Sequence, residues 1–299
     1  MKGERERPLM IGGQAVIEGV MMRGPHWVSV AVRRPDGSIA THTRRADSLL
    51  ARYRPLNLPL LRGAIVLYEA LVLGVQALLL SANETLGEEE KLSRWEAGLS
   101  LAIGLGLGIG LFFVLPTLLL RAVEGWFRHP LALNLGEGLV RVALVVGYIW
   151  GIARIQDLQR VFAYHGAEHK AVNAFEAKAP LIPSVVQSYS RLHLRCGTSF
   201  ILIVMLLALL LFSLLGRPPL PLRILSRILL IPVIAGLGYE VIRGGARFPW
   251  MRPLVIPGLW LQRLTTREPD DGQVEVAIAA LEEVVRREGG EISSRLARE

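Results

Sequence analysis

The sequence predicts a mainly α-helical protein that crosses a membrane several times and carries a small β-containing cap at its N-terminal end. Three observations predict this class. Hydrophobic residues make up 52% of the 299 residues, which is high for a soluble protein of this length. Nearly half of them gather in five long apolar runs. The first 57 residues, in contrast, are polar, rich in arginine and without helical periodicity.

The N-terminal segment, residues 1–57, contains a recognisable β-hairpin pattern. Residues 28–32 and 38–43 each alternate apolar with polar side chains, and Pro35-Asp36-Gly37 lies between them. A Pro-Asp-Gly turn between two alternating runs is typical of a hairpin. The preceding glycine-rich stretch, residues 12–25, indicates close backbone approach or unusual φ angles. We therefore expect this segment to form the β-containing cap.

The five apolar runs differ in how well they suit a membrane span, which needs about 20 apolar residues with a range of roughly 17–25. They cover residues 58–80, 98–120, 138–155, 199–216 and 222–242. The second and fourth runs meet the requirement cleanly. The first is interrupted by Glu69 and Gln76, and it is the least convincing span.

The distribution of Lys and Arg predicts the topology, because these residues favour the cytoplasmic side. If the 58–80 run lies in the interface or re-enters, 27 Lys and Arg lie on the cytoplasmic side and four outside. We therefore expect a plasma-membrane protein with four full spans, one interfacial or re-entrant helix, and both termini in the cytoplasm. The segment 154–198 would lie on the same side. The net charge of +8 suits anionic lipid headgroups, and no nucleic-acid recognition motif is visible.

The C-terminal segment, residues 257–299, predicts two helices. Residues 257–264 indicate a short interfacial helix, and residues 273–288 an amphipathic one. The apolar face of the second consists of Val274, Ala277, Ile278, Leu281, Val284 and Val285. Asp270, Asp271 or Gly272 can cap its start. The chain then divides into a cap (1–57), membrane helices (58–256) and this tail.

Two histidines and a glutamate form the main candidate for chemistry. Residues 164–170 contain the pattern H-x-x-E-H, the inverted form of the zinc-peptidase motif. On a helix, His165 and His169 share one face, about 5–6 Å apart at Cβ, a spacing that suits two ligands of one metal ion. A divalent metal, zinc in the first instance, would be held by the histidines, with Glu168 as general base. The alternative is a polar helix face whose side chains bond to neighbours.

A third metal ligand is needed, and the sequence offers several. Glu240 is attractive because a carboxylate at the end of an apolar helix needs a partner. Glu176, His193 and Cys196 are alternatives. Cys196 follows Arg195, so its thiol could act as a nucleophile or a metal ligand, or it could be a small buried residue at a helix start.

Several motifs together resemble a known family. They are residues 12–25, 164–170, 191–200, 257–262 and 265–271. These stretches resemble the YqhQ-like family, a bacterial membrane family of unassigned function whose members are labelled predicted metal-dependent enzymes. The resemblance extends over nearly the whole chain and implies that the stretches form one metal-dependent site. This chain departs from the family pattern at Leu194, where the family usually has proline.

Three functions fit these observations. The first is a metal-dependent hydrolase that acts on a peptide or a lipid-linked group at the cytoplasmic interface. The second is a non-enzymatic membrane scaffold, or an accessory of protein insertion or translocation, whose cytoplasmic face binds a protein partner. The third is a small-solute transporter that uses Glu69, Arg141 and Glu240 inside apolar runs, although the chain lacks the visible internal repeats common in transporters.

Overall fold

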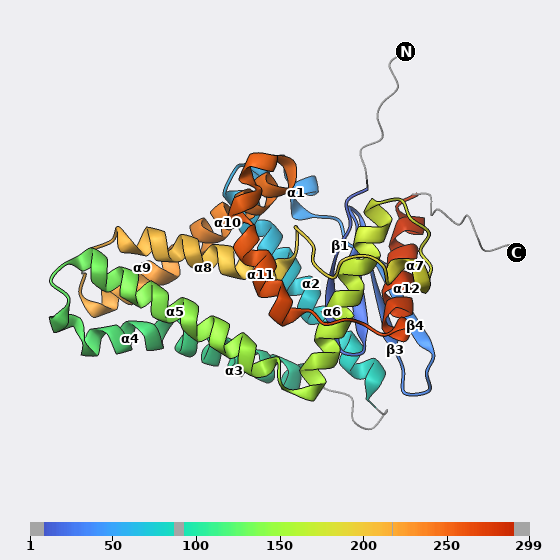
Figure 1. Ribbon diagram of the computed structural model, residues 1–299, viewed down its shortest axis with the longest axis horizontal. Coiled ribbons are helices and arrows are strands. Elements are labelled where there is room, and N and C mark those ends of the chain that lie inside the picture. The colour runs from blue at the N-terminus through green and yellow to red at the C-terminus, as the bar shows by residue number, and fades with distance from the viewer. Residues whose placement is uncertain (1–8, 87–92, 217, 290–299) are drawn as a thin grey trace, which may run out of the picture.

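The computed structural model describes residues 9–86, 93–216 and 218–289, and it shows an elongated helical bundle joined at one end to a layered α/β unit (Figure 1). The predicted class, mainly helical with a small N-terminal sheet, is confirmed. The strands are β1 (Gly12–Val16), β2 (Gly19–Arg23), β3 (Trp27–Arg33) and β4 (Ile39–Arg45). The helices are α1 (Leu49–Arg52), α2 (Leu61–Thr85), α3 (Arg94–Ile109), α4 (Leu115–Ala122), α5 (Pro130–Ile152), α6 (Gln156–Glu176), α7 (Pro183–Val186), α8 (Gly197–Ser213), α9 (Leu220–Leu229), α10 (Ile231–Arg247), α11 (Ile256–Thr265) and α12 (Asp271–Arg287).

The sheet is an antiparallel meander in the order β1-β2-β3-β4. The predicted hairpin is confirmed: β3 pairs with β4 from Arg33 opposite Ile39, and Gly37 in the turn has φ +85°, which favours glycine. The glycine-rich stretch supplies β1 and β2, joined by a two-residue turn in which Glu18 has φ +47°.

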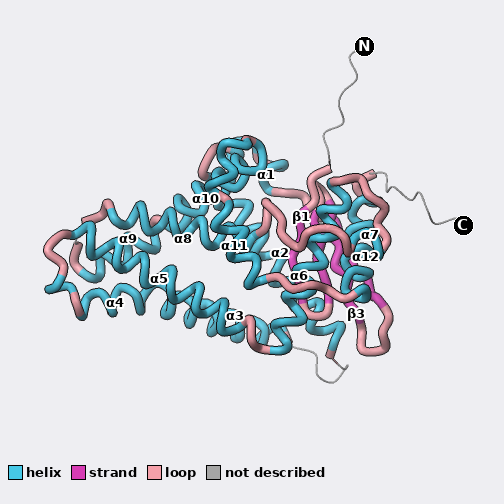
Figure 2. The backbone as a smooth tube through the Cα atoms, in the orientation of Figure 1, coloured by secondary structure: helices cyan, strands magenta, loops and turns pink. Residues whose placement is uncertain are grey.

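Helices cover both faces of the sheet (Figure 2). On one face, α6 and α12 pack against β1, β2 and β3 around a core that includes Val20, Met22 and Leu281. On the other face, α2 packs against Val16 and Val30. Segments from the start, middle and end of the chain therefore form one layered unit. The proposed division into three consecutive domains stays a prediction, and its ends, 1–8 and 290–299, lie outside the described residues.

Helix α12 matches its predicted amphipathic pattern. All six residues of the predicted apolar face are buried: Val274, Ala277, Ile278, Leu281, Val284 and Val285. Asp270 caps the helix, because its Oδ1 accepts a hydrogen bond from the backbone N–H of Gln273 at 2.7 Å and Gln273 bonds back in a capping box.

Four helical segments among the described residues are long and apolar enough to cross a membrane, as predicted in number. They are Leu61–Thr85, Trp95–Ala122, Pro130–Ile152 and Leu220–Arg247. Three of them largely coincide with predicted spans, and the fourth, Leu61–Thr85, covers the run predicted to be interfacial or re-entrant, which length and composition alone would allow to cross. The run 199–216 forms the shorter helix α8, because the helix is capped at Cys196 and ends at Ser213. The run 58–80 instead forms one of the longest apolar helices, α2.

Helix α2 connects the bundle to the sheet. It packs against α10 on one side and against the sheet on the other, and it is steeply inclined to the long axis of the bundle (Figure 1). Its second half is buried at Gly74, Ala77 and Ser81. A Cβ atom at Gly74 would lie 2.4 Å from Oε1 of Gln14, so glycine lets β1 approach the helix closely. This half of α2 therefore covers protein rather than lipid.

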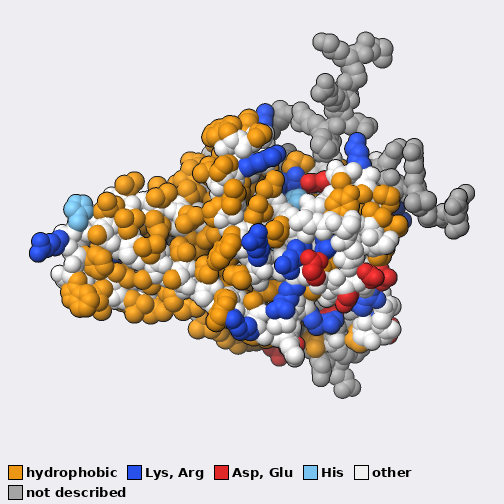
Figure 3. Space-filling model, in the orientation of Figure 1, with side chains coloured by type: hydrophobic (Ala, Val, Ile, Leu, Met, Phe, Trp, Pro, Cys, Tyr) orange, Lys and Arg blue, Asp and Glu red, His pale blue; other side chains and the backbone are white. Residues whose placement is uncertain are grey.

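The bundle encloses a buried charged cluster beside its apolar core and exposes an apolar surface. Glu137 on α5 is buried with Arg223 and Arg227 of α9. The opposite side of α9 exposes leucine and isoleucine: Leu222, Leu225, Ile228 and Leu229. Figure 3 shows the bundle surface as largely hydrophobic, whereas charged side chains gather on the layered unit. Ionisable residues inside membrane helices face the protein interior in this way.

Replacing Glu137 by glutamine should destabilise the bundle, because it leaves Arg141, Arg223 and Arg227 buried without their carboxylate. Breaking a buried ion pair costs about 3–5 kcal/mol. The measurement is the free energy of unfolding of the detergent-solubilised protein. The control is Glu275→Gln, which removes an exposed ion pair with Arg33, and such pairs contribute about 0–1 kcal/mol. Equal effects of the two substitutions would contradict the prediction.

Candidate metal centre

Helix α6 carries His165, Glu168 and His169 on one side, as the spacing predicts. The helix is covered along most of its second half, and the side next to the histidines packs against the sheet and α12. The imidazole rings of His165 and His169 lie 4.4 Å apart between their centroids. The two side chains therefore start from a rigid, buried element, which is what a preformed site requires.

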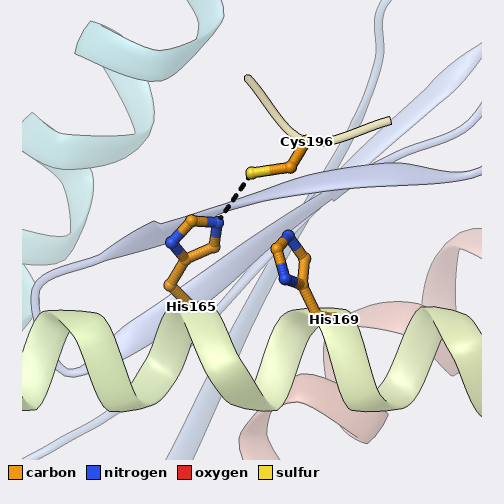
Figure 4. Close-up of side chains that lie close together, drawn as sticks. All are labelled: His165, His169 and Cys196. Carbon is orange, nitrogen blue, oxygen red and sulfur yellow. Dashed lines mark hydrogen bonds between the residues drawn. The ribbon is translucent and has the colours of Figure 1, made fainter. Parts of the chain in front are cut away.

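Cys196 completes a cluster with the two histidines. One ligand atom from each of His165, His169 and Cys196 lies within 4.8 Å of the others, and the two rings point from α6 toward the thiol (Figure 4). Cys196 is the N-cap of α8, and its Sγ accepts a hydrogen bond from the backbone N–H of Thr198 at 3.4 Å. Nε2 of His165 lies 3.2 Å from Sγ. The cluster could hold a metal ion.

The tautomers of both histidines follow from their hydrogen bonds. Nδ1 of His165 is 2.8 Å from the carbonyl oxygen of Thr265, and Nδ1 of His169 is 2.6 Å from that of Arg191. A carbonyl oxygen only accepts, so each Nδ1 donates and each neutral ring keeps its lone pair on Nε2. Metal-binding histidines in proteins are usually oriented by such a bond from the other ring nitrogen.

Gly166 explains how the carbonyl of Thr265 reaches His165. A Cβ atom at Gly166 would lie 2.0 Å from the backbone oxygen of Arg267, so only glycine permits this contact. The backbone N–H of Arg267 also donates to the carbonyl of Phe162 at 2.9 Å. The segment that follows α11 is therefore held directly against α6.

Glu168 lies beside the cluster and is buried. Its Oε2 is 3.4 Å from Nε2 of His169, and Gly13 of β1 covers it so closely that a Cβ there would be 2.6 Å from its Cγ. The close backbone approach expected for the glycine-rich stretch is thus confirmed at Gly13. Burial raises the pKa of the Glu168 carboxyl, and burial lowers the pKa of His169, which keeps that imidazole neutral.

The structure places His193 and Glu176 next to the cluster but not in it. The ring of His193 is 5.7 Å from that of His169 between centroids, and its Nε2 is 3.5 Å from Oε2 of Glu176. Glu176 also pairs with Arg195, and this ion pair and the His193 contact lower the pKa of its carboxyl. These two predicted ligands thus bind each other.

Glu240 is not brought into the cluster. Both of its carboxylate oxygens accept hydrogen bonds from Arg62 of α2, each at 2.6 Å. The expectation that this carboxylate needs a partner was sound, but the partner is a guanidinium group rather than a metal ion. The physical reason is the packing of α2 against α10, which brings Arg62 to Glu240.

Comparison with known proteins identifies the family. A family model described as a protein of unknown function, DUF1385, matches residues 58–287. The chain belongs to the DUF1385 family. It is also 38% identical over 306 residues to the uncharacterized protein YqhQ of Bacillus subtilis (strain 168), a match that covers 94% of each chain. The resemblance to a YqhQ-like family is confirmed. No solved structure matches.

Sequence reasoning missed the groups that orient the site of this DUF1385 protein. The carbonyls of Thr265 and Arg191 belong to the backbone, and no residue type marks them. Gln262, buried on α11, accepts from the backbone N–H of His193 at 2.9 Å and donates to its carbonyl at 2.8 Å. Two features of the sequence could have revealed these contacts. Gln262 is an amide side chain in an apolar helix, which indicates a buried hydrogen-bonding partner. Gly166 lies between the two histidines, which indicates a close backbone contact, here with Arg267.

Gly166→Ala should disrupt the cluster, because the new Cβ collides with the backbone of Arg267 and moves the carbonyl of Thr265 away from His165. We expect a loss of stability of about 1–3 kcal/mol from overpacking. Thermal unfolding of the purified protein measures it. Gly147→Ala is the matched control: this glycine on α5 has open space around its Cβ position, so alanine should be neutral or stabilising there. Equal losses would argue against the close contact.

The raised pKa of Glu168 predicts a pH dependence of stability in chelator-treated protein. The folded state holds this proton more tightly than the unfolded state, so the stabilisation is complete below the ordinary value of 4.5 and is lost as pH rises through the folded pKa. Glu168→Gln removes this titration. The stability of the wild type relative to this variant should therefore fall as pH rises above 4.5, measured by denaturant unfolding. A difference that is constant with pH would refute the assignment.

Proposed function

We propose that this DUF1385 protein is a multi-pass plasma-membrane protein whose layered unit faces the cytoplasm and acts as a metal-dependent hydrolase. One observation carries the proposal. Two histidines with their lone pairs on Nε2 converge with a thiol, and a buried carboxyl lies 3.4 Å from one of those nitrogens. Ligands and a proton acceptor are thus assembled in one place.

The donor set suits zinc. Imidazole nitrogen and thiolate are its preferred ligands, and a catalytic zinc site uses three protein ligands and leaves a fourth position open. His165, His169 and Cys196 would be the three. A zinc ion held there would supply a Lewis acid that polarises a carbonyl or phosphoryl group and activates water.

Glu168 would act as the general base and then as the acid. Its carboxyl accepts a proton from the attacking water and returns it to the leaving group. Burial raises the pKa of this carboxyl, which favours its role as the acid that returns the proton. The bonds from Nδ1 to the carbonyls of Thr265 and Arg191 would hold both rings in position throughout.

The position of the cluster suggests the substrate class and the partners. Cys196 begins α8, a helix of the bundle, whereas the histidines belong to the layered unit. We propose that the substrate approaches this junction from the membrane interface, which favours a peptide or lipid-linked group with membrane lipids as neighbours. The charge distribution supports a cytoplasmic location for this end and for both termini, where a protein partner could also bind.

Metal analysis tests the proposal. Protein purified without chelators should contain one divalent metal ion per chain, and His169→Ala or Cys196→Ser should lose it, measured by elemental analysis. Glu240→Gln is the control and should keep the metal, because Glu240 pairs with Arg62. Wild-type protein that contains no stoichiometric metal would contradict the proposal.

Glu168→Gln separates catalysis from metal binding. This variant should retain the metal but lose about 10²–10⁴-fold in chelator-sensitive hydrolysis, the usual contribution of general acid–base catalysis. Suitable probes are p-nitrophenyl esters and p-nitrophenyl phosphate. Full activity in the glutamine variant would exclude Glu168 as the base.

Burial of the cluster supports a second candidate, a structural metal in a non-enzymatic membrane scaffold or insertion accessory. His169 and Cys196 are both buried, and the cluster joins α6 to the start of α8 and the end of α11. A metal there would clamp the layered unit to the bundle. In a complementation test, loss of function in His169→Ala with full function in Glu168→Gln would favour this role.

The third function considered, a small-solute transporter, relied on Glu69, Arg141 and Glu240. All three are engaged in ion pairs within the protein.

A further inference from the structure

The arginine cluster inside the bundle, formed by Arg141, Arg223 and Arg227 around Glu137, has charges that do not cancel. The four residues are 4%, 3%, 2% and 1% exposed, respectively. Three guanidinium groups therefore face one carboxylate in a region from which water is largely excluded. Unpaired buried charge is costly, so a cluster of this composition requires a further anion or a route to solvent.

The carboxylate of Glu137 is already fully used. Its Oε1 accepts from Arg141 at 3.0 Å and from Thr117 at 3.1 Å, and its Oε2 accepts from Arg223 at 2.8 Å. Arg227 donates to both oxygens, at 3.2 and 3.3 Å. A carboxylate offers about four acceptor positions, so it cannot take more donors.

Within the described part of this cluster, two buried donors have no hydrogen-bond partner: Nε of Arg223 and Nη1 of Arg227. The neighbours offer only partial compensation. The ring of Phe212 lies 4.3 Å from Cζ of Arg227, and the amide oxygen of Asn134 accepts from the same guanidinium at 3.2 Å. Neither carries a full negative charge.

A pocket of about 360 Å³ lies against this cluster at the end of the bundle remote from the sheet, where α4 ends and α9 begins (Figure 1). Arg223 is shared between the cluster and the pocket wall. The lining residues are Arg121, Glu124, Pro218, Pro219, Leu220 and Arg223. Glu124 adds a carboxylate, so pocket and cluster together hold four guanidinium groups and two carboxylates. The pocket is open to the surface and lies within the usual size range of ligand sites.

We propose that this pocket binds a phosphate group, with Arg121 and Arg223 as its direct partners and with the charge of Arg141 and Arg227 behind them. Guanidinium groups match phosphate oxygens in a planar, two-pronged geometry. The negative charge of a phosphate, single in a diester and up to double in a monoester, offsets part or all of the cationic excess of the described cluster. The phosphate can belong to an anionic phospholipid headgroup or to a soluble phosphate compound.

The test uses the full chain in lipid nanodiscs and has two arms. In the first, inorganic phosphate is titrated into protein in phosphatidylcholine discs and followed by calorimetry. In the second, phosphatidylglycerol is added to the discs, and its retention on the released protein is followed by native mass spectrometry. Saturable binding in the first arm identifies a soluble source, and stoichiometric retention in the second identifies a lipid. Absence of both overturns the proposal.

Arg121→Gln and Arg128→Gln form a matched pair of variants. Both arginines are exposed, but only Arg121 lines the pocket, and neither bonds to Glu137. Arg121→Gln should weaken binding about tenfold, the effect of one lost charge-assisted hydrogen bond, whereas Arg128→Gln should bind as the wild type does. Equal affinities of the two variants would refute the assignment of the pocket.

Discussion

The contact between α6 and the segment that follows α11 is the interaction on which the arrangement of the two parts depends. Helix α11 packs within the bundle against α8, and α12 packs on the sheet. The few residues between them must therefore pass α6, and Gly166 lets the backbone of Arg267 come close enough. This route of the chain places the carbonyl oxygen of Thr265 beside Nδ1 of His165. Nδ1 therefore donates a hydrogen bond, and the lone pair of the neutral ring lies on Nε2. The close contact at Gly166 therefore determines both how the chain passes α6 and how His165 is oriented in the cluster.

A second feature recurs in the molecule: three carboxylates within apolar helices, Glu69, Glu137 and Glu240, each have arginine beside them. Glu69 pairs with Arg23, Glu240 with Arg62, and Glu137 with three arginines. The first two pairs join α2 to the sheet and to α10. Both pairs fix the first third of that helix, although its composition alone would let it cross a membrane. The third pairs α5 with α9 and leaves an excess of positive charge. Burial makes each of these partners necessary.

The parts of the fold and site that the sequence predicted are those governed by local pattern. The hairpin around Gly37, the apolar face of α12 and the shared face of His165 and His169 each follow from the period of a strand or a helix. The third member of the cluster required long-range information. The sequence favoured Glu240, with Glu176, His193 and Cys196 as alternatives, and only the position of Cys196 beside the two histidines in the folded chain distinguishes it. The backbone carbonyls that orient the rings could not have been predicted, because they carry no residue signature.

The sheet and the helices that cover it occur in the chain in an order that matters during translation. The four strands are complete by Arg45, and α2 follows at once to cover one face. The helices that cover the other face are α6, which follows three of the four long apolar segments, and α12, which lies at the far end of the described chain. During translation this face of the sheet, including Val20 and Met22, stays exposed until those helices follow. A chain that stops before α12 therefore leaves part of this apolar face uncovered, and exposed apolar surface of this kind is prone to aggregation.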